Sequence, residues 1–194
     1  MKGKARRRRR LLAGAAAVLA GVAVGAALGL FGKFGHVIQE LTLPLRHEDV
    51  IRQQAAEKHV DASLIAAVIY AESKFSDSTS SAGARGLMQI TPETAKEIER
   101  HSGGTSFKLG DLSDPEINIR YGTYRLRELL DRYDGDEVAA LAAYNAGPGS
   151  ADGWGGSDMA LGDIAFPETR AYVEEVLDKQ RAYRDAYPQE LGYR

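Results

Sequence analysis

The stretch Ser63–Phe75, Ser-Leu-Ile-Ala-Ala-Val-Ile-Tyr-Ala-Glu-Ser-Lys-Phe, predicts a helix that carries an apolar stripe and an acidic residue near its end. Four residues at helical spacing form the stripe, namely Leu64, Ile65, Val68 and Ile69. Glu72 lies one turn further along the same face. Because burial disfavours an unpaired carboxylate, and the negative end of the helix dipole acts in the same direction, this position predicts a raised pKa.

A glutamic acid with a raised pKa at the edge of a cleft can act as a general acid. From this stretch alone a structural interpretation is favoured. In that interpretation Glu72 would pair with a buried arginine or cap a neighbouring helix. Residues elsewhere in the chain are needed to decide between the two.

The rest of the chain after residue 46 also follows a helical pattern. Asp61 is the expected N-cap of the 62–73 helix. Thr91-Pro92 and Asp114-Pro115 have the sequence of helix starts, with proline at the first helical position. The expected helices cover about residues 47–59, 92–101, 115–133, 136–144 and 167–186. Residues 145–156 contain five glycines and a proline and are expected to form a loop. Since no segment alternates with period two, the predicted fold class is mainly α.

The charge of the chain is unevenly distributed. Eight of the 25 Lys and Arg residues precede position 34, whereas the first of the 27 Asp and Glu residues is Glu40. The remainder therefore has 17 basic and 27 acidic residues, a formal charge of −10. An acidic domain is a poor binder of nucleic acid, because phosphate affinity needs clustered Lys and Arg.

Residue types that would indicate other chemistry are missing or scattered. The chain has no cysteine, which excludes disulfides, thiolate metal ligands and a cysteine nucleophile. There is no Gly-x-Ser-x-Gly motif and no phosphate-binding loop. The four histidines lack the spacing of metal ligands, so no metal and no cofactor are expected. They are His36, His47, His59 and His101.

The N-terminal segment predicts export. Residues 1–10 are basic, and Leu11–Phe31 is an uncharged apolar run of 21 residues, about 31 Å long as a helix. That length matches the hydrocarbon thickness of a bilayer, and the basic residues place the N-terminus in the cytoplasm. We therefore expect a cytoplasmic tail, a single membrane anchor at 11–31, a linker at 32–45, and a domain in the cell envelope outside the cytoplasm. A cleaved signal segment is the alternative.

Three glycines in the apolar run repeat every four residues: Gly21, Gly25 and Gly29. This spacing allows transmembrane helices to approach closely, which would permit weak dimerisation. The alternative is that glycine is simply frequent in an Ala/Gly-rich segment.

Four separated motifs occur in the exported part of the chain. Taken singly, each has a structural explanation, such as a turn into a core helix, a helix stop or first-turn capping. The motifs are Glu72-Ser73, Gly83-Ala-Arg-Gly-Leu-Met-Gln-Ile90, Ala143-Tyr-Asn-Ala-Gly-Pro-Gly149 and Phe166-Pro-Glu-Thr-Arg-Ala-Tyr-Val173.

In this order and spacing, the four motifs resemble the soluble-lytic-transglycosylase (SLT) catalytic domain, a bacterial cell-wall family with a goose-type lysozyme-like fold. The resemblance covers about residues 46–188 and leaves 189–194 as a C-terminal tail. The chain departs from the family pattern after Glu72, where the loop is one residue shorter and lacks the usual Asn-Pro. The serine expected in this loop is therefore Ser80, with Ser81 as the alternative.

The resemblance implies a lytic transglycosylase that acts on peptidoglycan strands. Such enzymes cleave the β-1,4 bond between N-acetylmuramic acid and N-acetylglucosamine without water and leave a 1,6-anhydromuramyl end. By analogy, Glu72 would protonate the glycosidic oxygen and then deprotonate the muramyl C6 hydroxyl, which attacks C1. One residue would thus replace the usual two carboxylates, and we find no obvious second acid in the glycine-rich loops. The substrate's own N-acetyl group could stabilise the oxocarbenium-like state.

Side-chain chemistry, together with matches to the family pattern at Ser80 and Glu168, indicates the substrate-binding residues. Met88 and Gln89 would line the sugar subsite, as an apolar wall beside an amide. Tyr144 would orient Glu72 or the acetamide through its hydroxyl, with Asn145 beside it. The remaining candidates are Ser73 and Ser80 as positioning residues, Glu168 on the muramyl side or as a helix cap, and Trp154 as a sugar platform or a loop anchor.

Two rival functions remain open. The first is a hydrolysing muramidase on the same fold, which would leave reducing ends. The second is a non-catalytic binder of peptidoglycan strands. The presence of Glu72, Gln89 and Tyr144 together argues against a binder, which has no need of the acid.

Overall fold

The computed structural model describes residues 40–80, 83–102 and 108–193. The chain divides into two units, Met1–Leu43 and Pro44–Arg194. The predicted anchor at 11–31 and its three glycines lie outside the described residues. Within the described ranges, no helix is long and apolar enough to cross a membrane.

The second unit is built from helices. The described part of the chain has no strand there, only isolated bridges that pair Arg85 with Thr79 and Ile90. The mainly α fold is therefore confirmed. The α-helices are α2 (Glu48–Lys58), α3 (Ala62–Ser73), α4 (Pro92–Ser102), α5 (Pro115–Arg132), α6 (Glu137–Ala146), α7 (Pro148–Trp154) and α8 (Pro167–Ala186), and the short 3₁₀ helices are η1 (Leu109–Ser113), η2 (Gly156–Asp158) and η3 (Leu161–Asp163).

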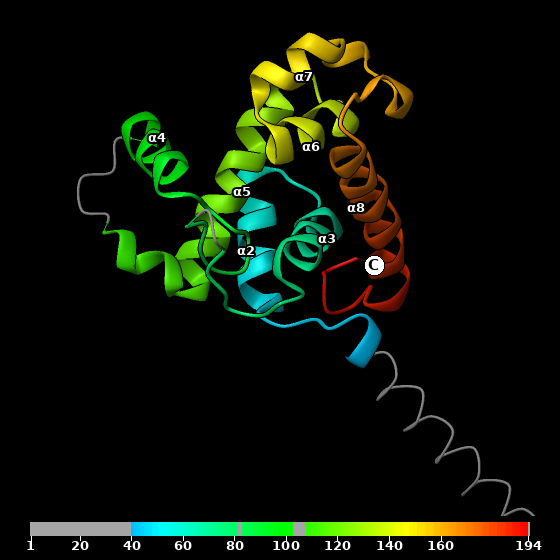
Figure 1. The fold of residues 1–194 in the computed structure, drawn as a ribbon. Coiled ribbons are helices and arrows are strands. Elements are labelled where there is room, and N and C mark those ends of the chain that lie inside the picture. Colours follow the sequence, from blue (N-terminus) through cyan, green and yellow to red (C-terminus); the bar gives the residue numbers. More distant parts are fainter. Residues whose placement is uncertain (1–39, 81–82, 103–107, 194) are drawn as a thin grey trace, which may run out of the picture. The chain divides into compact units, whose positions relative to one another are not determined.

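Helix α3 lies at the centre of this unit, between α2 and α8 (Figure 1). All eight residues of the segment 62–69 are buried, including the four of the predicted stripe. The helix is thus apolar on every side, as expected for an element that is surrounded by others. It becomes partly exposed only in its last turn, where Glu72 lies.

The helix starts predicted from the sequence are confirmed by their capping bonds. The Asp61 carboxylate accepts the backbone N–H groups of residues 63 and 64 at 2.9 and 3.1 Å. Asp114 caps α5 in the same way, at 2.9 and 3.1 Å. At α4 the Thr91 hydroxyl accepts the N–H of Thr94 at 3.1 Å. Each cap satisfies donors that have no partner inside the helix.

The prediction that residues 145–156 form a loop was wrong. Gly147, with φ 86° and ψ 151°, ends α6, and Pro148 then starts the short helix α7. Tertiary contacts hold this helix, because Ala151 is fully buried. In addition, the Asp152 carboxylate accepts hydrogen bonds from Arg132 at 2.6 Å and from Tyr133 at 2.9 Å.

The segment after α8 packs back onto the domain. Leu191 is 3% exposed, and the Tyr193 hydroxyl donates to the Asp61 carboxylate at 2.7 Å. The same hydroxyl accepts the backbone N–H of Ser63 at 2.9 Å. Residues 189–193, which we delimited as a tail, therefore cover the start of α3.

Candidate active site

Glu72 lies in the last turn of α3 and is hydrogen-bonded by a tyrosine from α8. The Tyr172 hydroxyl donates to Glu72 Oε1 at 2.8 Å. Burial raises the pKa of Glu72 from its ordinary 4.5 to about 7, although the bond from Tyr172 acts in the opposite direction. The raised pKa agrees with the prediction from the apolar stripe. No arginine pairs with this carboxylate within the described residues, in contrast to the structural interpretation left open by the sequence.

The backbone reverses immediately after Glu72. Lys74 and Phe75 both have left-handed conformations, with φ of 52° and 60°. Such conformations are unfavourable for residues other than glycine and persist when the surroundings enforce them. Here Phe75 is buried and its ring lies 6.1 Å from that of Tyr183, while the N–H of Lys74 closes α3 on the carbonyl of Tyr70 at 2.9 Å. Packing of Phe75 thus fixes the end of the helix that carries the acid.

Tyr144 of α6 is close to Glu72 but does not hydrogen-bond it. Its hydroxyl donates to the backbone carbonyl of Met88 at 3.0 Å. The residue that contacts the acid is Tyr172, which the sequence analysis quoted within a motif without giving it a role. Burial, followed by the negative charge of Glu72, raises the pKa of both tyrosines well above 10. Both hydroxyls are therefore protonated donors at neutral pH.

The structure places the side chain of Met88 in the core, which differs from the apolar sugar-facing wall that we expected. The residue is fully buried. A Cβ atom added at Gly122 of α5 would lie 2.3 Å from the Met88 sulfur, so the side chain fills the space that this glycine leaves. The group that Met88 directs toward the site is its carbonyl, which Tyr144 holds.

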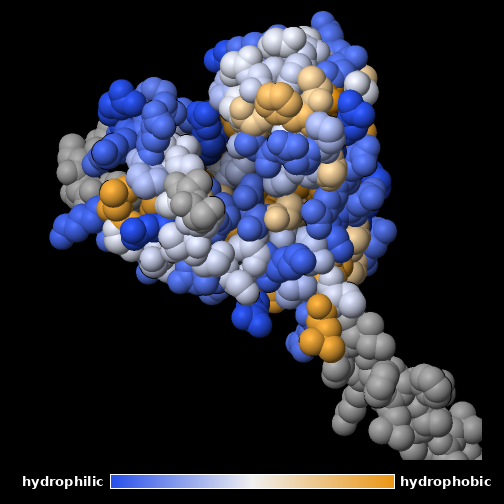
Figure 2. Space-filling model, viewed as in Figure 1, coloured by the Kyte–Doolittle hydropathy of each residue, from blue (hydrophilic) through white to orange (hydrophobic). Residues whose placement is uncertain are grey.

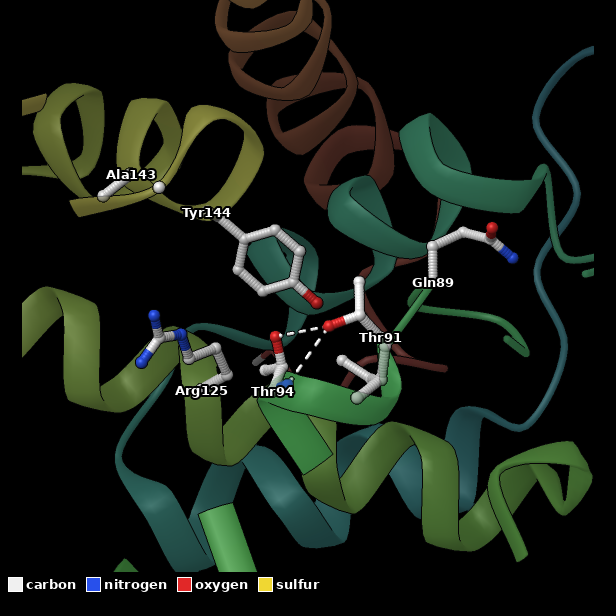
Figure 3. A pocket seen from close by; sticks show the side chains of 8 residues that line it. Gln89, Thr91, Thr94, Arg125, Ala143 and Tyr144 are labelled. Carbon is white, nitrogen blue, oxygen red and sulfur yellow. Dashed lines mark hydrogen bonds between the residues drawn. The ribbon is translucent and has the colours of Figure 1, made fainter. Parts of the chain in front are cut away.

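Gln89 lies at the same turn, with a φ of 47°. Its amide nitrogen donates to the carbonyl oxygens of Ser78 and Gly86 at 3.0 and 2.8 Å, and to the Ser78 hydroxyl at 3.2 Å. Figure 3 shows the amide pointing away from Tyr144. In this conformation the hydrogen bonds of Gln89 stabilise the turn formed by residues 78–80 and 83–89. Its contact with a sugar stays a prediction.

Asn118 organises this turn and was missed by the sequence analysis. It is fully buried in α5. Its amide donates to the carbonyls of Arg85 and Leu112 at 2.8 and 2.9 Å and accepts the N–H of Met88 at 2.7 Å. Gly86 has to be glycine here, since its φ is 74° and an added Cβ would lie 2.2 Å from the Asn118 amide. The available signal was a polar residue on the inward face of a predicted helix.

The other predicted residues make local contacts of their own. Ser73 donates to the Ile69 carbonyl at 3.1 Å, and the Ser80 hydroxyl accepts the N–H of Ala84 at 3.1 Å. Asn145 accepts the Thr169 hydroxyl at 2.8 Å, which links α6 to α8. The last two candidates are Glu168, exposed in the first turn of α8, and Trp154, whose ring packs edge-on against Phe166 at 4.9 Å.

A pocket of about 220 Å³ opens beside Tyr144. The space-filling view is hollowed between α4 and the part formed by α6 and α7 (Figure 2). The lining comes from the start of α4, from α5 and from the end of α6 (Figure 3). The lining residues are Gln89, Ile90, Thr91, Thr94, Arg125, Ala143, Tyr144 and Gly147. Among the described residues, no group of three His, Cys, Asp or Glu could hold a metal ion.

The helical fold, with Glu72 at the partly exposed end of its central helix, agrees with the class of protein that the family comparison identifies. Residues 49–166 match the family model described as the transglycosylase SLT domain. The chain belongs to this family, as the four motifs indicated.

Individual relatives agree with this assignment. The chain is 33% identical over 162 residues to the soluble lytic murein transglycosylase of Escherichia coli K12, covering 79% of this chain and 25% of the relative. It is 30% identical over 188 residues to the membrane-bound lytic murein transglycosylase C of Edwardsiella ictaluri, covering 77% and 52%. The chain thus spans between a quarter and about half of the length of these relatives.

Solved structures give the same fold. The 70-kDa soluble lytic transglycosylase of Escherichia coli superposes with a TM-score of 0.71 at 34% identity, covering 76% of this chain and 25% of that one. An inactive glutamate-to-glutamine mutant of the lytic transglycosylase Slt from Pseudomonas aeruginosa gives the same values. The expected lysozyme-like helical fold of the SLT domain is therefore confirmed.

Proposed function

We propose that this protein is a peptidoglycan lytic transglycosylase that cleaves the MurNAc-β-1,4-GlcNAc bond and leaves a 1,6-anhydromuramyl end. The observation that carries the proposal is Glu72, a buried carboxyl with a pKa of about 7 that receives a hydrogen bond from Tyr172. Such a group is protonated in about half of the molecules at neutral pH, as a general acid requires.

The geometry supports a role for Glu72 in two successive steps. Tyr172 occupies Oε1, which leaves Oε2 to carry the proton toward the glycosidic oxygen. Transfer of that proton breaks the C1–O bond and leaves a carboxylate, which the hydrogen bond from Tyr172 stabilises. The carboxylate then takes the proton of the muramyl C6 hydroxyl as the C6 oxygen bonds to C1. The acid is thereby restored, and no water is consumed.

The relatives support lytic over hydrolytic cleavage. The relatives named above are called lytic transglycosylases or lytic murein transglycosylases, and one of them is described as inactive after a glutamate-to-glutamine replacement. We propose that Glu72 is the equivalent residue. The hydrolysing muramidase differs only in the nucleophile, since water would replace the C6 hydroxyl. A non-catalytic strand binder would not need Glu72, because the charged form of this largely buried acid lowers the stability of the folded protein.

We further propose that the protein acts in the cell envelope. The basic residues 1–10 and the apolar run at 11–31 would anchor it, with the SLT domain outside the cytoplasm. One relative, from Edwardsiella ictaluri, is named membrane-bound. Protease digestion of intact spheroplasts, followed by detection of the two ends of the chain, tests this arrangement.

The activity is tested by digesting purified sacculi with the full chain and analysing the products by mass spectrometry. Muramyl ends one water lighter than reducing ends are expected, and reducing ends would show that the enzyme is a muramidase. Glu72→Gln is expected to release nothing while still binding strands. Bulgecin A, which is bound in a structure of the 70-kDa soluble lytic transglycosylase, is expected to inhibit release. Strand binding without product from the wild type would establish the binder.

A further inference from the structure

The pocket beside Tyr144 contains a cation that no role described so far uses. Arg125 reaches from α5 toward α6 (Figure 3), and its side chain is only 18% exposed. Its nearest charged partner is Glu128, with Nη1 and Oε2 3.5 Å apart. This ion pair is loose, because the buried Glu128 Oε2 has no hydrogen-bond partner. Within the described residues Glu128 is the only ion-pair partner of Arg125, and a guanidinium has five N–H donors in a planar fork, so donors of Arg125 remain for a ligand in the pocket.

A hydroxyl donor lies on the same pocket wall. The hydroxyl oxygens of Thr91 and Thr94 are 2.9 Å apart, and either can donate to the other. Whichever donates, the O–H of its partner remains free. Thr91 also accepts the N–H of Thr94 at 3.1 Å, which fixes the pair at the start of α4. The pocket thus combines a planar cation, which can only donate, with one hydroxyl whose O–H is available to donate.

We propose that this pocket binds a carboxylate carried by the muramyl residue of the substrate, and that Arg125 determines this specificity. The inference rests on the proposed action on peptidoglycan. A carboxylate accepts a guanidinium in a two-point contact and has further lone pairs for a hydroxyl, which matches the donors present. Tyr144 lines the pocket and lies close enough to the acid that, after burial, the charge of Glu72 raises the pKa of its hydroxyl.

Two parts of the substrate supply this chemistry. In strands without peptides, the lactyl group of each muramyl residue ends in a free carboxylate. In strands with stem peptides, that carboxyl is an amide and the carboxylates lie further along the peptide. With about 220 Å³, the pocket has room for a short acidic arm rather than for a further disaccharide.

The test compares strands whose carboxylates are free with the same strands after conversion of those groups to neutral amides. Peptide-free strands form one arm and peptide-bearing strands the other. For wild type, we expect neutralisation to raise KM about tenfold or more in the arm that supplies the ligand, with little change in kcat. Arg125→Gln should raise KM for the free acid by a similar factor and should respond little to neutralisation. Arg125→Lys should retain part of the preference, since it keeps the charge and loses the fork.

Arg120→Gln is the matched control, because it removes one positive charge from an exposed position of the same helix. It should show the wild-type preference. A preference in the peptide-free arm identifies the lactyl carboxylate, and one in the peptide-bearing arm identifies the stem peptide. If neutralisation changes KM equally in wild type and Arg125→Gln, or in neither, the inference is wrong.

Binding measurements separate this inference from the proposed activity. The affinity of Glu72→Gln for free-acid and neutral strands is compared with that of the double variant Glu72→Gln/Arg125→Gln. Carboxylate-dependent binding that is lost in the double variant would support the inference even if wild type released no product. Product release without that dependence would support the activity and refute the role of Arg125. Thermal unfolding of each variant checks that the domain is folded.

Discussion

Replacement of Glu72 by glutamine should stabilise the protein increasingly as the pH rises. In the folded state the pKa of Glu72 is about 7, against an ordinary value of 4.5, so the folded protein binds more protons than the unfolded chain between these values. Wild-type stability must therefore decline as the pH rises through this window. Glutamine has no proton to lose and removes this decline.

The magnitude follows from the two pKa values. Their difference, roughly 2.5 pH units at about 1.36 kcal/mol per unit, gives a cost of about 3 kcal/mol that is complete above pH 8. Relative to its value at pH 4.5, the stability advantage of Glu72→Gln should grow by this amount by pH 8.5. For a chain of this size the corresponding gain in Tm is about 6–12 °C.

Urea unfolding of wild type and variant at half-unit steps from pH 4.5 to 9 measures the difference directly. Groups that titrate identically in both proteins cancel. Glu174→Gln, which removes an exposed carboxylate of α8, is the control and should stay within about 0.5 kcal/mol of wild type throughout. A pH-independent difference for Glu72→Gln would refute the raised pKa. A difference that declines with pH would show that an ion pair, not burial, dominates at this carboxyl.

Three further substitutions test the surroundings of the acid and the core beneath it. Tyr172→Phe removes the hydrogen bond that lowers the pKa of Glu72. The alkaline limb of the profile of kcat/KM against pH should therefore move to higher pH, and kcat should fall about tenfold. An alkaline limb that does not move would contradict the effect of Tyr172 on this pKa. Asp61→Ala should lower the free energy of unfolding by about 1–2 kcal/mol at pH 7. This loss should disappear as the pH falls below 3.8, because, in spite of burial, hydrogen bonds lower the pKa of Asp61 in the folded state. A loss that thermal unfolding finds unchanged at pH 3 would exclude a contribution from the charge. Gly122→Ala should lower the free energy of unfolding in urea by about 1–3 kcal/mol, since the new methyl group would overlap Met88. In a double-mutant cycle, Met88→Ala should reduce this loss. Losses that simply add in the double variant would refute the packing argument.

Local signals predicted the helices well. The starts of α3, α5 and α8 were predicted from Asp61, from Asp114-Pro115 and from Pro167, because caps and proline act within one turn of the chain. Helix α7 was missed for the opposite reason. Its glycines favour a loop, and the contacts that make it helical come from Arg132 and Tyr133 in another part of the chain.

The raised pKa of Glu72 was predictable from the sequence, but the geometry around this residue was not. Burial of Glu72 followed from the helical period of its own stretch. Its partner Tyr172 lies 100 positions away and contacts it only because α8 packs along α3. The direction of the Met88 side chain was likewise set by Gly122 in α5, whose missing side chain leaves the space that the sulfur fills. A sequence motif identifies the residues of a turn, but packing against other helices determines which of their groups faces the pocket. For Met88 that group is the backbone carbonyl and not the side chain.

The same helix thus supplies both the core of the domain and Glu72, the residue that we propose as the catalytic acid. Helix α3 is buried on all sides through residue 69, and Glu72 lies three residues further on, next to this apolar core. Phe75, packed in a left-handed turn, prevents the end of the helix from moving outward to solvate the carboxylate. The cost of about 3 kcal/mol at alkaline pH is therefore a consequence of holding the proton near neutrality, and stabilising the charged form with a nearby cation would weaken the acid. This agrees with a neutral tyrosine, Tyr172, as the side chain that donates to Glu72 in the part of the chain that the structure describes, where no arginine pairs with this carboxylate.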